Sequence, residues 1–456
     1  MDIQALVAAQ RAYFNTGATL PLAARKAALK RLRGTIKANE ADISAVLRAD
    51  LNKSPTESYM CEVGLTLSEL SFVEKRLARW MADRPHLTPL AQFPARSFTA
   101  VSPYGVVLIM SPWNYPFLLT MEPLIGAIAA GNCAVVKPSA YSPAASAVIR
   151  DILAECFPAE FVSVVEGGRE ANQALLDQKF DYIFFTGGVE VGKEVMSKAA
   201  VHLTPVTLEL GGKSPCIVDS TARLDLAAKR LVFGKLLNCG QTCVAPDYLL
   251  IDRRVKDRFL ACVTRWITVM YGQNPLDNAG YVRMVNQKHF DRVMGLIDQS
   301  KVLFGGRGDR STLKIQPTIL DNVSPEDPVM QEEIFGPVLP VLTFDRVEEA
   351  AAFVNARPHP LAVYLFSREK RTQELFLRRV PFGGGCVNDT IIHLATSRMG
   401  FGGVGNSGMG SYHGRNSFNT FSHRKSIVKK SNLLDLPVRY PPYSPTKDRL
   451  LRLFLR

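Results

Sequence analysis

Apolar positions recur at helical spacing through the first 80 residues. They fall in three segments, IQALVAAQRAYF (3–14), PLAARKAALKRLRGTIKANEADISAVLRAD (21–50) and ESYMCEVGLTLSELSFVEKRLARWM (57–81). Repeats of three and four residues predict helices with one buried face, and Asn15, Gly17 and Pro21 separate the first two segments. Pro85, Pro89 and Pro94 then predict an extended connector.

From Phe98 to Gly212 the pattern changes to short apolar runs that alternate with helical stretches. The runs are VVLIM (106–110), CAVVK (133–137), FVSVV (161–165), YIFFT (182–186) and VTLEL (206–210). Helical stretches lie near 118–131, 142–156, 169–177 and 189–201. Buried parallel strands joined by crossover helices have this pattern, so we predict a doubly wound α/β domain.

A second α/β unit follows. Its expected strands are CIV (216–218), YLLI (248–251), KVLF (301–304), KIQPTIL (314–320), VLPVLTF (338–344) and AVYLF (362–366). Its expected helices lie near 223–238, 254–271, 283–298, 348–356 and 371–379. After Phe382 the chain becomes glycine-rich, which predicts loops with close backbone approaches. From about residue 424 we expect an arm or edge strand and a proline-rich end.

Composition indicates an enzyme-sized globular protein. The 456 residues, 47% hydrophobic and 21% charged, correspond to about three domains of roughly 150 residues each. We expect a cytoplasmic location with reduced thiols, because neither a secretory signal nor an apolar stretch of about 18 residues is visible. Eight cysteines occur without a CxxC pair, so we predict no structural zinc and no other metal site.

Positive charge is concentrated near the end of the sequence. Lys and Arg outnumber Asp and Glu by 13 over the chain, and by nine to two within 423–456. Prolines at 437, 441, 442 and 445 break any long basic helix there, so nucleic-acid binding is not expected. The segment KDRLLRLFLR (447–456) is amphipathic and too short to span a bilayer. We expect either a weak contact with anionic lipid or ordinary solvated charge.

Three residues could carry covalent chemistry. Cys243 in GQTCVAPDY (240–248) follows a helical segment, where nearby backbone N–H groups would favour a thiolate nucleophile. Glu209 in LELGGKSP (208–215) ends a strand, which is where open α/β sheets place catalytic groups. Asn114 in SPWNYPF (111–117) lies between two prolines, and its amide could donate to an oxyanion. The alternatives are an inert buried thiol, a solvated glutamate and a packed aromatic turn.

Three further motifs suggest a phosphate-bearing ligand. FFTGGVEVGKEV (184–195) is a strand, then Gly187, Gly188 and Gly192, then a helix, although the spacing is not GxGxxG. Lys137 ends a strand in CAVVKPSAYSP (133–143), within reach of a ribose or phosphate. QEEIFGPVLPV (331–341) offers Glu333 and Phe335 before a Gly-Pro turn. A surface role is the alternative for each side chain.

Taken together and in order, the motifs PWNYP, KPS, FTG, LELGGK, GQTC and EEIFGP resemble the aldehyde dehydrogenase superfamily. The stretches FGGVGNSGMG, FSHRKS and VRYPPY look more narrowly like its class 3 and fatty aldehyde dehydrogenase branch. The resemblance implies an α/β fold with a Rossmann-like NAD(P)-binding domain (1–83 and 105–209) and a catalytic domain (210–408). It also implies a bridging and oligomerisation arm (84–104 and 421–456), with a homodimer as the expected assembly.

For this family the implied reaction is oxidation of an aldehyde to a carboxylic acid with NAD or NADP. The Cys243 thiolate attacks the carbonyl, and the Asn114 amide with the Cys243 N–H holds the oxyanion of the thiohemiacetal. Glu209 is the implied base for hydrolysis of the thioester. The implied cofactor-binding residues are Trp113, Lys137, Ala140, Thr186, Gly187, Gly188, Gly192, Glu333 and Phe335. A role for Glu333 as a second base stays open.

Two positions depart from the family pattern. Ala140 stands where many NAD-preferring relatives have a glutamate that binds the adenine ribose and repels a 2′-phosphate, so we predict that NADP is used well. The alternative is that other groups bind the ribose and both cofactors work. Met399 and Gly400 stand where relatives often have Leu-Pro, and we expect added flexibility there.

The residues that resemble pocket-lining ones in this branch are apolar or aromatic, namely Leu65, Tyr115, Leu237, Leu394 and Phe401. Medium- or long-chain aliphatic aldehydes and aromatic aldehydes both fit such a pocket. His413 is expected near its entrance, or as a loop histidine that bonds to backbone. A CoA-acylating dehydrogenase is an alternative, but that branch usually lacks the carboxylate at Glu209. Use of the fold as a non-catalytic scaffold would not require Asn114, Glu209 and Cys243 together.

Overall fold

The computed structural model describes residues 2–455 and begins with the predicted helices. They are α1 (Ile3–Asn15), α2 (Leu22–Ala38), α3 (Glu40–Leu51), α4 (Pro55–Ser58) and α5 (Gly64–Met81). Asp2 caps α1 by accepting hydrogen bonds from the N–H groups of Gln4 and Ala5. A π-helical turn, Tyr59–Val63, interrupts the predicted continuous helix between α4 and α5.

A six-stranded sheet forms the centre of the first α/β unit, in the order β17-β7-β6-β3-β4-β5. Its parallel strands are β3 (Val106–Met110), β4 (Cys133–Lys137), β5 (Val162–Val164), β6 (Tyr182–Thr186) and β7 (Val206–Glu209). The crossover helices are α6 (Leu118–Ala130), α7 (Pro143–Cys156), α8 (Arg169–Leu176) and α9 (Val189–Ala200). The predicted doubly wound pattern is confirmed, and a late strand, β17 (Gly408–Met409), joins β7 antiparallel.

The second α/β unit contains a seven-stranded sheet in the order β10-β13-β14-β9-β8-β15-β16. Its strands are β8 (Pro215–Val218), β9 (Tyr248–Asp252), β10 (Val302–Phe304), β13 (Thr318–Leu320), β14 (Val338–Phe344), β15 (Ala362–Phe366) and β16 (Gly384–Val387). Its helices are α10 (Leu224–Leu236), α11 (Lys256–Tyr271), α12 (Gln287–Gly295), α13 (Pro328–Gln331), α14 (Val347–Asn355) and α15 (Lys370–Arg379). Only β10 runs antiparallel to its neighbour.

Three details of this unit differ from the prediction. The run 314–320 is two strands, because β12 (Lys314–Ile315) pairs with β11 (Gly308–Asp309) and Pro317 cannot donate to a ladder. Of the range 283–298 expected to be helical, α12 takes up only the part that begins after its cap, Asn286. The glycine-rich run after Phe382 contains β16, which lies so close to β15 that a Cβ at Gly385 would be 2.1 Å from the Val363 carbonyl oxygen.

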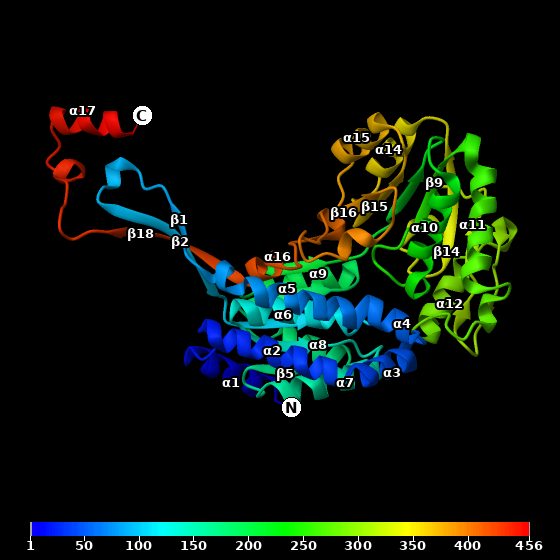
Figure 1. The fold of residues 1–456 in the computed structure, drawn as a ribbon, viewed down its shortest axis with the longest axis horizontal. Coiled ribbons are helices and arrows are strands. Elements are labelled where there is room, and N and C mark those ends of the chain that lie inside the picture. Colours follow the sequence, from blue (N-terminus) through cyan, green and yellow to red (C-terminus); the bar gives the residue numbers. More distant parts are fainter. Residues whose placement is uncertain (1, 456) are drawn as a thin grey trace.

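The connector and the tail together form an arm. The strands β1 (Arg84–His86), β2 (Ala95–Pro103) and β18 (Ser422–Lys430) make a third sheet, and β18 pairs with β2 along nine residues. The connector expected to be extended therefore contains two strands. Figure 1 shows this arm projecting from the body, between α16 (Arg415–Thr420) at its base and α17 (Pro445–Phe454) at its tip. Within residues 2–455, no helix has the length and apolar character needed to cross a membrane.

Candidate active site

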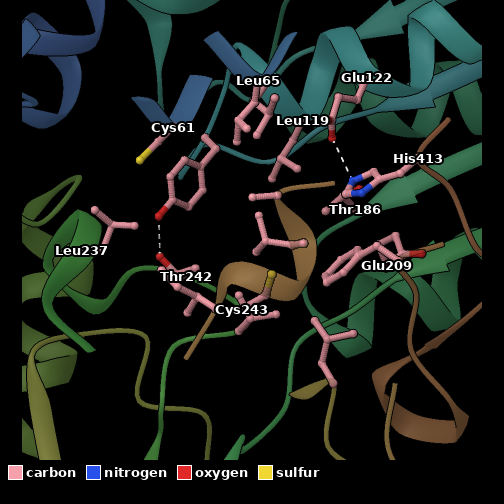
Figure 2. Close-up of a pocket in the computed structure, with 18 of the residues that line it drawn as sticks. Cys61, Leu65, Leu119, Glu122, Thr186, Glu209, Leu237, Thr242, Cys243 and His413 are labelled. Carbon is pink, nitrogen blue, oxygen red and sulfur yellow. Dashed lines mark hydrogen bonds and ion pairs between the residues drawn. The ribbon is translucent and has the colours of Figure 1, made fainter. Parts of the chain in front are cut away.

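Loops at the carboxyl ends of β3, β6 and β7 converge on a cavity of about 300 Å³. Residues from all three loops line it, and they are joined by Cys243 from the segment that follows α10. Figure 2 shows Cys243, Glu209 and Thr186 facing the cavity from its lower and right-hand sides. The carboxyl edge of a parallel sheet is where open α/β folds place ligands, which accounts for the meeting of these distant residues.

Cys243 is held by a tightly turned segment. The three residues Asn238, Cys239 and Gly240 have φ values of 53°, 56° and 73°, all in the left-handed region. Gly240 is required there, because a Cβ would lie 2.3 Å from the Gly336 carbonyl oxygen. Burial raises the pKa of Cys243 to about 12, with Glu333 and Glu209 adding to the effect and the N–H groups of Cys243 and Val244 opposing it. The thiol is therefore neutral until a base or a ligand changes its surroundings.

Glu209 ends β7 and is 3% exposed. Among the described residues, neither of its carboxylate oxygens has a hydrogen-bond partner. Burial raises the pKa of Glu209 well above its ordinary value, so its carboxylate has a high affinity for a proton. Gly408 of β17 pairs with the Glu209 backbone and fixes the end of the strand. A buried carboxyl group of this kind becomes an effective base when water reaches it.

Asn114 is 2% exposed and does not itself line the cavity. Its side-chain Nδ2 donates a 2.9 Å hydrogen bond to the carbonyl of Gln241, two residues before Cys243. The Asn114 Oδ1 atom has no partner within residues 2–455. The structure therefore brings the Asn114 amide to the segment that carries the thiol.

All five predicted pocket residues line the cavity, together with Cys243 and Glu209. They are Leu65, Tyr115, Leu237, Leu394 and Phe401. The Tyr115 hydroxyl group is 2.7 Å from the Thr242 hydroxyl group, a contact drawn in Figure 2 that joins the 111–117 loop to the cysteine segment. The remaining lining residues are mostly aliphatic, so the cavity suits an apolar ligand.

The other end of the cavity is polar. His413 is 5% exposed, and its Nε2 lies 3.0 Å from a carboxylate oxygen of Glu122, so the histidine pairs with a side chain and not with backbone (Figure 2). Burial alone would lower the pKa of His413, but Glu122 and then Glu69 outweigh it and raise that pKa above its usual value. Sequence reasoning missed Glu122, although it is the one charged residue in the otherwise apolar helix α6.

A second, more open cavity of about 570 Å³ extends from Val189 at the start of α9 to Gly211 and Glu333. Glu333 lies against the glycines after β7, since a Cβ at Gly211 would be 1.9 Å from its Oε2. Within the described chain its Oε1 is buried without a partner. Burial raises the pKa of Glu333 to about 8, with Asp247 adding to the effect and the Gly212 N–H opposing it. Val189, the first residue of α9, therefore shares one cavity with Glu333, whereas Gly187, Gly188 and Gly192 do not line it.

An aromatic contact lies on the cofactor side of the predicted site. Phe335 has φ +48°, and its ring meets the Trp113 ring edge-on at 5.3 Å. The predicted Thr186 carries a buried hydroxyl oxygen without a partner among residues 2–455. Gly187 and Gly188 follow it, and Gly192 is buried within α9, where a Cβ would be 2.7 Å from Leu210. The glycines thus permit close packing around the start of α9.

Lys137 and Ala140 line neither cavity. The Lys137 ammonium donates to the Pro138 carbonyl at 2.7 Å, and burial lowers its pKa to about 8, opposed by Glu166. Glu166 follows β5 and pairs with Arg150 at 2.7 Å. Sequence reasoning did not identify the pair of Glu166 and Arg150 near Lys137.

Gly400 is a packing position, and the added flexibility expected at Met399 and Gly400 stays a prediction. A Cβ at Gly400 would lie 2.3 Å from the Ser411 hydroxyl oxygen and 2.4 Å from the Asn416 side-chain nitrogen. A larger residue would displace both side chains. The absence of a side chain therefore lets the 399–403 segment approach the 411–416 segment closely.

Comparison with known proteins gives one consistent result. The model of the aldehyde dehydrogenase family matches residues 1–427. The chain is 47% identical over 435 residues to 4,4'-diaponeurosporen-aldehyde dehydrogenase of Staphylococcus aureus, covering 95% of each chain. It is 44% identical over 443 residues to the dimeric NADP-preferring aldehyde dehydrogenase of Canis lupus familiaris, covering 96% of this chain and 98% of that one. The substrate-bound structure of Staphylococcus aureus AldH superposes with a TM-score of 0.98 at 45% identity, covering 100% and 99% of the two chains.

Proposed function

The chain belongs to the aldehyde dehydrogenase family, and from that premise we propose that it oxidises apolar aldehydes to carboxylic acids. Medium- and long-chain aliphatic aldehydes rank first and aromatic aldehydes second. One observation carries the proposal: Cys243 and Glu209 open onto a cavity whose remaining wall is mostly aliphatic and aromatic. The name of the Staphylococcus aureus relative, 4,4'-diaponeurosporen-aldehyde dehydrogenase, supports an aldehyde as the substrate.

The residues divide the reaction between them. Cys243 gives its proton to solvent water, and the thiolate attacks the aldehyde carbon. The Cys243 N–H and the Asn114 Nδ2, which the Gln241 carbonyl holds beside the cysteine segment, donate to the resulting oxyanion. The hydrogen on the aldehyde carbon leaves as hydride, which leaves a thioester on Cys243. Glu209 takes a proton from water, and the water oxygen attacks the thioester carbon. The carbon–sulfur bond breaks, the carboxylic acid leaves, and the Cys243 thiolate takes the proton that Glu209 had accepted, which restores both groups.

A nicotinamide dinucleotide, bound as NAD or NADP, supplies the hydride acceptor. The residues fit such a group, because Glu333 has a buried oxygen without a partner in the described chain, suited to a ribose hydroxyl. No side chain among residues 2–455 caps α9, so its first N–H groups are free to donate to a phosphate at Gly187 and Gly188. Trp113 and Phe335 present aromatic faces on that side.

For cofactor preference we propose that NADP is used well. Ala140 is exposed and carries no charge that would repel a 2′-phosphate, and Lys137 is close to it in sequence. Arg150 offers a second cation if Glu166 releases it. Steady-state rates with both cofactors test the proposal, since Ala140→Glu should shift kcat/KM towards NAD. Equal or better kcat/KM of the wild type with NAD, together with no shift in the variant, would contradict it.

The activity itself is tested by NAD(P)H formation from hexanal and from benzaldehyde in the absence of CoA. Wild-type protein should form NAD(P)H, and Cys243→Ala should form none above background. A series of aldehydes of increasing chain length should show kcat/KM rising with apolar length. Activity that required CoA would replace the hydrolytic reaction by a CoA-acylating one.

We also propose a cytoplasmic homodimer whose arm contributes to assembly. Support comes from β18, which lies at the edge of the three-stranded sheet and leaves one side of its ladder open to a partner strand. Size-exclusion chromatography with light scattering tests this. A weak contact of the tail with anionic lipid stays a proposal supported by the basic, partly apolar helix α17. Unchanged liposome binding after deletion of 447–456 would remove it.

A further inference from the structure

A fully buried ion pair lies behind the loop that carries Asn114. Lys53, between α3 and α4, and Glu62, in the π-helical turn, each have no exposed side-chain surface. The Lys53 Nζ is 2.5 Å from Glu62 Oε1 and also donates to the Asn114 backbone carbonyl at 2.9 Å. A buried pair of charges costs solvation energy that apolar side chains would not, so its presence calls for a reason beyond packing.

The pair holds both ends of the Asn114 loop. Glu62 Oε2 accepts hydrogen bonds from the N–H groups of Phe117 at 2.9 Å and Leu118 at 3.3 Å, where the loop enters α6. The Lys53 ammonium lies 4.1 Å from the centre of the Tyr115 ring. The charged atoms thus contact the loop at 114, 115, 117 and 118, and no simple apolar replacement could make these contacts.

The π-helical turn explains how Glu62 reaches this position. Its neighbour Cys61 lines the substrate cavity, whereas Glu62 is directed into the buried space behind the loop. Turns of this kind insert one residue into a helix and are frequent at functional sites. Because of the inserted residue, Cys61 faces the cavity while the next residue, Glu62, places its charge in the buried space behind the loop.

Asn238 completes the arrangement from the cysteine side. Its Nδ2 donates to the Asn114 carbonyl at 2.9 Å and to the Gln241 carbonyl at 3.0 Å. The Gln241 carbonyl also accepts from Asn114 Nδ2. The backbone and side chain of Asn114 are therefore both tied to groups that position the segment leading to Cys243.

We propose that Lys53, Glu62 and Asn238 act as a clamp of positioning residues that aims the Asn114 amide at the oxyanion. This rests on the proposed function, in which Asn114 Nδ2 holds that oxyanion. None of the three touches substrate. Their effect passes through Asn114, so it disappears when the Asn114 amide is absent. A displacement of about 1 Å in a catalytic group can lower a rate by roughly a hundredfold.

The test is a double-mutant cycle with Asn114→Ala. The variant K53M/E62Q removes both charges and keeps the side-chain lengths. It should lower kcat for hexanal roughly 10- to 100-fold in the wild-type background with little change in KM, and less than about twofold in the Asn114→Ala background. The control K256M/D321N removes a partly buried pair that contacts no site residue, and it should leave kcat unchanged. An equal loss in both backgrounds, or no loss in a folded variant, would overturn the clamp.

A second variant avoids dependence on the folding of K53M/E62Q. Asn238→Gly keeps the left-handed backbone at that residue and removes both Nδ2 hydrogen bonds. We expect a smaller loss of kcat that again vanishes with Asn114→Ala, and an equal loss in both backgrounds would overturn the role of Asn238. Amide hydrogen exchange provides a readout without activity, since the clamp predicts faster exchange in 111–118 for each variant. Wild-type protein without aldehyde oxidation would refute the proposed function but would leave this exchange test intact.

Discussion

A buried ion pair lies in or behind each end of the cavity at the candidate active site, and the two pairs differ in their exposure to a ligand. Lys53 and Glu62 lie behind the cavity wall, with no exposed side-chain surface and with three backbone contacts and one aromatic-ring contact to a single loop. His413 and Glu122 line the cavity itself. The His413–Glu122 pair joins two opposite charges only when His413 is protonated.

The Lys53–Glu62 pair is therefore a fixed structural element, whereas the His413–Glu122 pair can respond to its surroundings. The sealed pair contacts only protein groups, so it can set geometry but cannot respond to a ligand. The open pair can exchange a proton or a hydrogen bond with whatever fills the cavity. Nearby Glu69, which accepts from the Gly414 N–H, adds negative charge beside this pair and raises the pKa of His413 further. Three predictions test whether the two ends behave this differently.

The largest effect is expected from Lys53→Met, which leaves Glu62 as an unpaired buried charge. Loss of one partner of a buried pair costs about 3–5 kcal/mol of unfolding free energy. Urea unfolding at pH 7 measures it. Lys256→Met, in a pair whose side chains are 18% and 19% exposed, provides the control and should cost about 1 kcal/mol or less. A loss of unfolding free energy below about 1 kcal/mol for Lys53→Met would show that the Lys53–Glu62 pair does not stabilise the fold.

A smaller and pH-dependent effect is expected from Glu122→Gln. The pKa of His413 is raised in the folded protein, so the stability that this pair contributes is fully present below the unfolded histidine pKa and is lost as pH rises through the folded one. We expect Glu122→Gln to cost about 1–3 kcal/mol at pH 5.5 and progressively less at higher pH.

Unfolding curves of wild type and Glu122→Gln at a series of pH values measure the difference in unfolding free energy between the two proteins. The matched comparison is K53M/E62Q, whose difference from wild type should stay constant over the same pH range. If the effect of Glu122→Gln were also constant, His413 would not be the titrating partner, and the contrast between the two ends would fail.

The smallest effect concerns the apolar wall between the two pairs. Leu65→Ala removes apolar contact area beside the cavity, and the lost burial is worth about 1–2 kcal/mol in binding, which is roughly 5- to 30-fold in kcat/KM for a long-chain aldehyde. A two-carbon aldehyde should show little change, because it does not reach the wall. Equal losses for both substrates would indicate that Leu65 acts on the chemistry and not on substrate binding.

Much of the fold could be predicted because its strands are buried on both faces. Runs such as VVLIM and CAVVK have every residue buried, and no polar position interrupts them. Strand β16 escaped prediction because GGCV has little side-chain hydrophobicity, and the ladder to β15 holds it in place. The division of 314–320 into two strands at Pro317 depends on which strands β12 and β13 pair with. The hydrophobic pattern of the sequence does not contain this information.

The candidate site shows the same boundary between local and distant information. Cys243, Glu209 and Asn114 are recognisable because each lies in a distinctive local motif. Lys53 looks like any solvated lysine between helices, and its value arises only from partners nine and 61 residues away. The π-helical turn that directs Glu62 inward has no signature in helical periodicity. The roles of Lys53 and Glu62 can be recognised only from their contacts in the folded structure.

The short strand β17 has a consequence for how the site is completed during synthesis. The end of β7 is finished by a strand that begins at Gly408, and the cavity wall by Tyr412 and His413. Because a ribosome releases the chain from its N-terminus, a nascent polypeptide carries thiol, amide and carboxylate long before their enclosure exists. The residues that complete the cavity wall therefore leave the ribosome after the thiol, amide and carboxylate that they enclose.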